Sequence, residues 1–264
     1  MFGMNLVPYY IMKALETLAS CILLYYAGRL MNGDRVSSFL FSAVSMVGYQ
    51  SAAWWKIGTH EMQGTLLFAI SWVALMLWIR KQNKIYEIIS IISAILMMLY
   101  KESYLVLGPF IMIFAVYYDM MLCGFSITLN NVWKVVKQRW TYLLTLGVSF
   151  LIFTCYFVFV VGIGGYDMAG DNSGNIIMDF YNGITGSLEN NMKWYFRFGV
   201  LFIAILLTYW EELKKRWPEM LLVLTYLVPQ LAVYGRVGFS GHYLQPISIV
   251  ISLFFVLWTW NWEP

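Results

Sequence analysis

The sequence predicts an all-α protein, a polytopic bundle of about nine transmembrane helices. Of its 264 residues, 61% are hydrophobic and only 12% are charged, and the mean hydropathy is +0.67. A soluble domain has roughly 45–50% apolar and about 25% charged residues, so this chain has too few polar groups for a water-exposed surface. Its apolar residues fall into runs near the ~20 residues that cross a bilayer, and no recurring alternation predicts barrel strands.

These properties exclude a soluble enzyme, a nucleic-acid binder, a disordered protein and a secreted disulfide scaffold. The net charge of +3 gives no reason to expect nucleic acid as a partner. Cys21, Cys123 and Cys155 have no paired spacing, so neither a disulfide framework nor a zinc motif is predicted. Lys13 and Glu16 interrupt the first apolar stretch, which therefore does not read as a signal peptide.

We expect a single transmembrane domain over 1–264. The fourth and eighth predicted spans are short, so each is tilted, capped by polar loops or partly re-entrant. The predicted spans are 9–31, 36–54, 63–79, 85–100, 103–122, 141–163, 194–210, 220–234 and 243–262.

Basic residues predict how these spans are oriented, because cytoplasmic loops are enriched in lysine and arginine. Four alternating loops carry clusters of basic residues, and the other side carries scattered single ones and the acidic loop 164–191. This places the N-terminus outside and the C-terminus in the cytoplasm, in a plasma membrane that we expect to be bacterial. The clustered residues are Arg29, Arg35, Arg80, Lys81, Lys84, Lys134, Lys137, Arg139, Lys214, Lys215 and Arg216.

Charged residues inside a span are costly and are therefore functional candidates. Lys13, Glu16 and Ser20 form one stripe of the first span, and a similar stripe begins at Glu87. The alternative interpretation is structural, since polar side chains also form hydrogen bonds between helices.

Two segments on the outer side contain groups suited to catalysis or phosphate binding. His60 and Glu61 form a pair that suits proton transfer or metal ligation, although one further histidine is too few for a His-rich zinc site. Lys101 lies in a tight outer turn, where its ammonium suits a phosphate and Glu102 is placed to hold it. Simple interfacial loops remain the alternative for both segments.

A third outer segment, the glycine-rich stretch 234–246, joins the last two spans. Arg236 and His242 are candidates for binding a phosphate or diphosphate, and His242 and Tyr243 open the last helix, whose N-terminus favours anions. Anchoring of the loop at the membrane interface is the alternative.

On the cytoplasmic side, the stretch 134–140 predicts an amphipathic segment that lies on anionic lipid.

Three of these outer segments occur in the order found in a known family. An acidic residue (Glu61) precedes a span, Lys101-Glu102-Ser103 follows about forty residues later, and a glycine-rich segment ends in His242-Tyr243-Leu244-Gln245-Pro246. The chain resembles the polytopic GT-C glycosyltransferases, which include protein mannosyltransferases and aminoarabinose transferases. The resemblance covers essentially the whole chain, but its motifs are short and permissive.

The resemblance implies an enzyme that transfers a sugar from a lipid-linked donor, a polyprenyl phosphate, to an acceptor on the outer face. It assigns Lys101, Arg236, His242 and Tyr243 to the phosphate, with Glu102 orienting Lys101. It makes Glu61 an acidic residue of the catalytic site, with His60 beside it. Some members use a divalent metal and others do not, so the cofactor stays open.

Two features depart from the family pattern. His242 stands where arginine is common, and the chain lacks the family's first outward-running span and the external loop with the catalytic aspartate. The resemblance therefore implies an N-terminally truncated module whose principal base lies outside these residues.

Other functions remain open. A secondary transporter or a lipid or polysaccharide flippase is the leading alternative, although such proteins usually have internal repeats and broken helices near the midplane. An O-antigen polymerase or ligase shares the substrate class, but it places arginines in its long outer loop, and 164–191 has none. The third alternative is an assembly partner without activity of its own.

Overall fold

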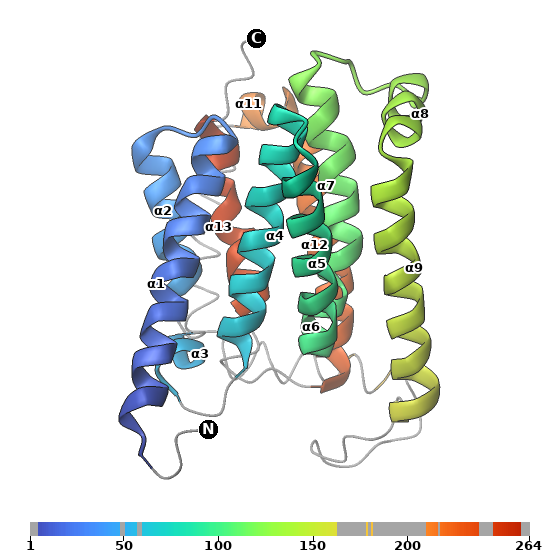
Figure 1. Ribbon diagram of the computed structural model, residues 1–264. Coiled ribbons are helices and arrows are strands. Elements are labelled where there is room, and N and C mark those ends of the chain that lie inside the picture. The colour runs from blue at the N-terminus through green and yellow to red at the C-terminus, as the bar shows by residue number, and fades with distance from the viewer. Residues whose placement is uncertain are drawn as a thin grey trace.

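The chain folds as a bundle of helices that run up and down between two ends (Figure 1). The computed structural model describes residues 5–47, 51–56, 60–162, 178, 181, 210–215, 217–237 and 245–259. Within these ranges the regular structure is helical, without a β-strand. The predicted all-α class is therefore confirmed for the described part of the chain.

The helices follow one another with short connections. They are α1 (Val7–Leu30), α2 (Arg35–Met46), α3 (Ala52–Trp55), α4 (Glu61–Lys81), α5 (Lys84–Tyr100), α6 (Glu102–Leu105), α7 (Leu107–Leu122), α8 (Leu129–Gln138), α9 (Trp140–Tyr156) with its π-helical continuation η2 (Phe157–Gly162), α11 (Trp210–Lys215), α12 (Trp217–Val237) and α13 (Gln245–Thr259).

Four helical stretches are long and apolar enough to cross a membrane: Val7–Leu30, Glu61–Lys81, Ser103–Leu122 and Trp140–Val160. They correspond to the first, third, fifth and sixth predicted spans. α5, α12 and α13 coincide with the fourth, eighth and ninth. Residues 194–209 of the seventh predicted span lie outside the described residues, so the total of nine stays a prediction.

The second predicted span, 36–54, is wrong as a single helix, because α2 ends at Met46 and α3 begins several residues later. The last carbonyls of a helix need hydrogen-bond donors from elsewhere. Gln245 Nε2 and Ser248 Oγ of α13 donate to Ser45 O over 3.0 and 2.9 Å. The indole N–H of Trp54 donates to Met46 O over 3.0 Å. These side chains satisfy the end of α2, so the chain can leave the helix there.

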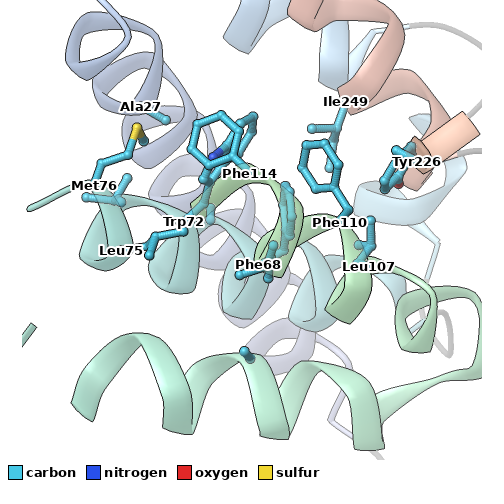
Figure 2. Packing of buried hydrophobic residues seen from close by; sticks show 14 of the residues in the cluster. Ala27, Phe68, Trp72, Leu75, Met76, Leu107, Phe110, Phe114, Tyr226 and Ile249 are labelled. Carbon is cyan, nitrogen blue, oxygen red and sulfur yellow. The ribbon is translucent and has the colours of Figure 1, made fainter. Parts of the chain in front are cut away.

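Aromatic side chains from three helices form the centre of the bundle (Figure 2). Trp72 of α4 meets Phe68 and Phe114 with ring centroids 5.1 Å apart in each case, and Phe110 of α7 meets Tyr226 of α12 at 5.2 Å. Tilted and edge-on ring pairs at these distances are favourable beyond the area that they bury. The packing fixes α7 against α4 on one side and α12 on the other.

The outer surface of the bundle is apolar. On α5 a stripe of exposed residues comprises Ile85, Ile88, Ile92, Leu96 and Leu99, each 46–62% exposed. The opposite side of α5 buries the hydroxyl of Ser90. Apolar side chains outside and polar ones inside suit helices surrounded by lipid, where polar groups need partners within the protein. Together with the four long apolar helices, this surface is consistent with a membrane protein.

One end of the bundle collects those clustered basic residues that the structure describes, and we call it the basic end. The α1–α2 turn, the α4–α5 turn, α8 and α11 all lie there (Figure 1). Gln82 ends α4 in the left-handed conformation (φ 54°), and the side chain of Asn83 caps α5. Asp34 caps α2, and the hydrogen bond from the Ser37 N–H holds the pKa of Asp34 below its ordinary value. α3, α6 and the start of α4 lie at the opposite end, the α6 end (Figure 1).

Candidate functional site

Four charged side chains gather between helices at the α6 end, and we call them the charged cluster. They are Lys13 and Glu16 of α1, Glu61 at the start of α4, and Lys101, which precedes α6. Lys101 Nζ forms an ion pair with Glu61 Oε1. The Glu61 side chain is completely buried, whereas that of Lys101 is 22% exposed. The resemblance implies that Glu61 and Lys101 belong to the same site, and the structure places them in contact.

A tyrosine of α6 holds this ion pair in place. Tyr104 Oη donates to the Glu61 backbone carbonyl over 2.6 Å and lies 2.8 Å from Thr65 Oγ1. The same ring packs against Gly64, where any Cβ would come within 2.8 Å of it. Lys101 itself is extended (φ −163°, ψ 151°), and its carbonyl accepts from the Tyr104 N–H. The short helix α6 is thus fixed on the first turn of α4, which brings Lys101 to Glu61.

α1 supplies the second half of the cluster. Glu16 Oε1 accepts from Gln63 Nε2 over 2.9 Å, and Lys13 Nζ donates to the Ala53 carbonyl over 3.0 Å. Lys13 is 5% exposed, and both Glu16 and Glu61 interact with it electrostatically. Lys13 and Glu16 thus contact neighbouring helices, in keeping with the structural interpretation of this stripe. The sequence treated this stripe apart from Glu61 and Lys101, whereas the structure joins the two.

Several oxygen atoms around the cluster remain available as acceptors. Glu16 Oε2, Glu61 Oε2, Gln63 Oε1 and Ser103 Oγ are buried without a hydrogen-bond partner among the described residues. Two carboxylates and two ammonium groups make the cluster formally neutral. It therefore combines cationic donors, which suit an anion, with acceptors, which suit hydroxyl groups.

His60 lies at the surface beside this cluster. It immediately precedes α4 and is exposed, and its ring meets that of Tyr100 edge-on with centroids 6.0 Å apart. Glu16 also interacts with His60 electrostatically. Its predicted part in proton transfer stays a prediction.

The remaining predicted site residues are described only in part. The backbones of Glu102 and Arg236 lie in α6 and in the last turn of α12, but their side chains are outside the described residues, as are His242 and Tyr243. α12 ends at the α6 end of the bundle (Figure 1). α13 begins there as well, since Gln245 contacts Ser45 near the end of α2. The described backbone thus leads Arg236 to the same end as Lys101. The predicted orientation of Lys101 by Glu102 stays a prediction.

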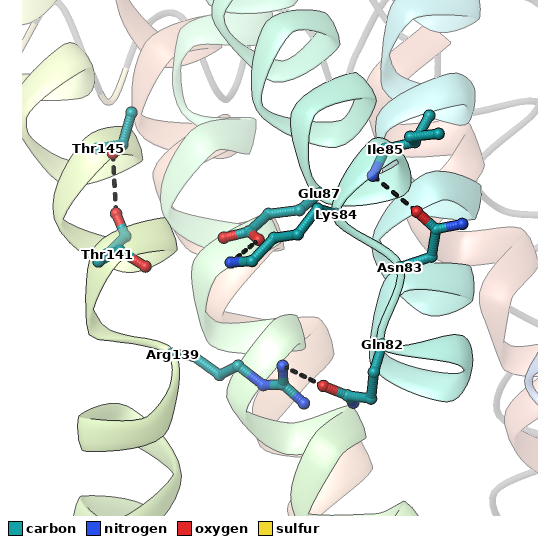
Figure 3. A network of polar contacts seen from close by, with 8 residues as sticks. All are labelled: Gln82, Asn83, Lys84, Ile85, Glu87, Arg139, Thr141 and Thr145. Atoms are coloured by element: carbon teal, nitrogen blue, oxygen red, sulfur yellow. Dashed lines mark hydrogen bonds and ion pairs between the residues drawn. The ribbon is translucent and has the colours of Figure 1, made fainter.

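A second buried polar network, at the basic end, was missed by the sequence analysis. Arg139 Nε pairs with Asp119 Oδ2 over 2.6 Å. Arg139 Nη1 donates to Gln82 Oε1 over 3.1 Å, as Figure 3 shows. The guanidinium also stacks over the Trp78 ring at 4.5 Å. Both charged side chains are about 95% buried. This network joins α4, α7 and α9, and we assign it a structural role.

Among the described residues, no three His, Cys, Asp and Glu side chains lie where they could hold a metal ion together. Comparison of the chain with protein-family models, with curated proteins and with solved structures found no match.

Proposed function

We propose that this chain is a membrane glycosyltransferase of the GT-C type that takes a sugar from a polyprenyl-phosphate donor. The observation that carries the proposal is the ion pair between Glu61 and Lys101, two residues 40 positions apart. The resemblance noted in the sequence places both in one catalytic site. Their contact supports the view that the two motifs act together.

The location of the pair supports a site on the outer face of the membrane. The clustered basic residues occupy the other end of the bundle, and by the positive-inside rule that end faces the cytoplasm. The charged cluster then lies at the extracytoplasmic interface, with the N-terminus outside. A lipid-linked phosphate would sit at that depth.

The exposure of the pair fits the chemistry. Lys101 is partly exposed, so its ammonium can donate to a phosphate while Glu61 holds it from the buried side. During transfer the acceptor hydroxyl loses its proton to a base, its oxygen bonds to the anomeric carbon, and the bond from that carbon to the phosphate oxygen breaks. Negative charge grows on the departing lipid phosphate, where Lys101 with Arg236, His242 and Tyr243 would stabilise it. The exposed His60 would assist proton transfer beside it.

Binding of a polyprenyl phosphate to the purified full-length chain in nanodiscs tests the proposal. We expect Lys101→Ala to weaken binding by about tenfold or more, the loss of one charge-assisted hydrogen bond. Lys101→Arg retains the charge and should retain most of the affinity. The neutral polyprenol should bind weakly to every variant, because it lacks the phosphate.

Lys81→Ala is the matched control, since it removes a lysine at the basic end. Removal of Lys101 leaves the Glu61 carboxylate buried without its ion-pair partner, which by itself destabilises the cluster. The double variant Lys101→Ala with Glu61→Gln removes that unpaired charge. Loss of binding in the double variant then reports the missing ammonium group and not a misfolded cluster. Unchanged affinity in Lys101→Ala, or equal affinity for phosphate and polyprenol in the wild type, would refute the phosphate site.

A secondary transporter or flippase without enzymatic activity is the second candidate function. The interruption between α2 and α3 favours it, because transporters often bind their substrates at broken helices. The buried charges of Lys13 and Glu61 favour it as well. A transporter predicts lipid or solute movement in proteoliposomes that contain no sugar acceptor, whereas a transferase needs the acceptor to turn over.

A further inference from the structure

α8 is a short helix at the basic end that packs on the bundle by one edge only. It contacts α7 and α9, and Val135 is its one buried residue. Its start is fixed, because Asn131 Nδ2 donates to Ser126 O over 2.8 Å. Arg139 follows it and pairs with Asp119 inside the bundle. α8 is therefore a docked element with one free face.

The free face combines large apolar side chains with lysines. Leu129 is 85% exposed, Trp133 59% and Trp140 56%. Leu129, Trp133 and Lys137 are spaced four residues apart, so they lie along one side of α8, and Trp140 opens α9 after the turn at Arg139. Lys137 Nζ lies over the Trp133 ring at 5.5 Å, so the cation and the apolar surface are adjacent.

In the part of the chain that the structure describes, the lysines of this face form no ion pair with a carboxylate. The sequence contains no Asp or Glu from residue 120 to residue 166. Among the described residues, Lys134 and Lys137 make ring contacts, to Phe125 and Trp133, and no ion pair. An anionic partner would complement both lysines.

The position of α8 points to the kind of partner. Directly after Arg139 the chain enters Trp140–Val160, one of the helical stretches apolar enough to span a membrane. The start of a span lies at the membrane surface, and tryptophan and lysine are side chains favoured at that depth. The partner then has acyl chains for Leu129 and Trp133 and phosphates for the lysines.

We propose that α8 is an anionic-lipid binding helix. It lies in the headgroup region of the leaflet at the basic end, with Leu129, Trp133 and Trp140 at the acyl boundary and Lys134 and Lys137 on the phosphates of anionic phospholipids. This proposal stands apart from the sugar-transfer proposal and needs only that the bundle spans a membrane.

The proposal is tested by measuring which phospholipids the full-length chain retains. The protein is reconstituted with equal amounts of phosphatidylglycerol and phosphatidylcholine, and the lipids that stay bound on release from the bilayer are counted by native mass spectrometry. We expect the wild type to retain an excess of phosphatidylglycerol. The double variant K134Q/K137Q should lose this excess by about threefold or more, since each lysine near a charged surface adds attraction.

The double variant K81Q/K214Q is the matched control, because it removes two positive charges from the same end but not from α8. It should keep the lipid excess of the wild type. Equal loss in both double variants would show that total charge, not α8, selects the lipid. No phosphatidylglycerol excess in the wild type would also overturn the proposal, and a protein partner would then be the better occupant of this face.

Discussion

Glu61 shows how much one residue can depend on its neighbours. A carboxylate that is removed from water costs several kcal/mol unless a cation and further donors compensate it. Lys101 provides the ion pair, and Lys13 adds a second positive charge nearby. These charge interactions link α1, α4 and the start of α6, so a change in the position of any of these helices should move the Lys101 side chain.

Gly64 provides a test of this coupling that leaves every charged group in place. We expect Gly64→Ala to weaken polyprenyl-phosphate binding several-fold and to cost about 1–3 kcal/mol of stability, as overpacking does. The new Cβ would lie 2.8 Å from the Tyr104 ring, and hydrogen bonds to Glu61 O and Thr65 hold that ring in place. α6 must then move, and Lys101 with it. Binding titrations and thermal unfolding measure the two effects.

Gly147→Ala is the control for this substitution. Its Cβ would lie 3.8 Å from Met112 Sδ, an ordinary contact, so neither binding nor stability should fall. If Gly64→Ala binds as the wild type does although its unfolding temperature drops, the position of α6 does not control the phosphate site.

The residues of the site were predictable in part. Glu61 and Lys101 stood out because charges beside spans are rare and because their order resembles that of a known family. The contribution of Lys13, Glu16 and Gln63 was not predictable as part of the same cluster. Their spacing along α1 and α4 shows which residues share a face, but not which face of α1 meets the start of α4.

At the scale of elements, most of the predicted apolar runs coincide with helices, four of which are long and apolar enough to span a membrane, and the difference at α2 has a physical cause. The break after α2 was missed because apolar content does not report where backbone carbonyls find partners. Those partners come from Gln245 and Ser248, about 200 residues further along the chain. The amphipathic segment predicted over 134–140 overlaps the second half of α8, but Arg139 is buried and Trp140 belongs to α9, and the contact of this segment with lipid stays a prediction.

Arg139, between α8 and α9 at the basic end, shows the same limit of prediction from sequence. The arginines of this end were counted only as positive charges that orient the chain. Arg139 is in fact buried and paired with Asp119, with Gln82 and Trp78 around it. Its packing role depends on contacts with α4 and α7 that sequence position alone does not reveal.

For the whole molecule, the predicted orientation can be checked with a native cysteine. Cys123 is exposed and follows α7 at the basic end. If that end faces the cytoplasm, a membrane-impermeant maleimide should label Cys123 in inverted membrane vesicles and not in intact cells. Peptide mapping locates the label, and Cys123→Ser should abolish it. Labelling of Cys123 in intact cells would reverse the orientation and place the charged cluster in the cytoplasm.

The most direct test of the central claim is to find where a polyprenyl phosphate binds. A polyprenyl phosphate with a photoreactive group near its phosphate is crosslinked to the full-length chain in nanodiscs, and the labelled peptides are identified by mass spectrometry. We predict labels near residues 60–64 and 101–105, competed by unlabelled polyprenyl phosphate and reduced in Lys101→Ala. Labels confined to the basic end or spread evenly over the lipid-facing helices would contradict a phosphate site at Glu61 and Lys101.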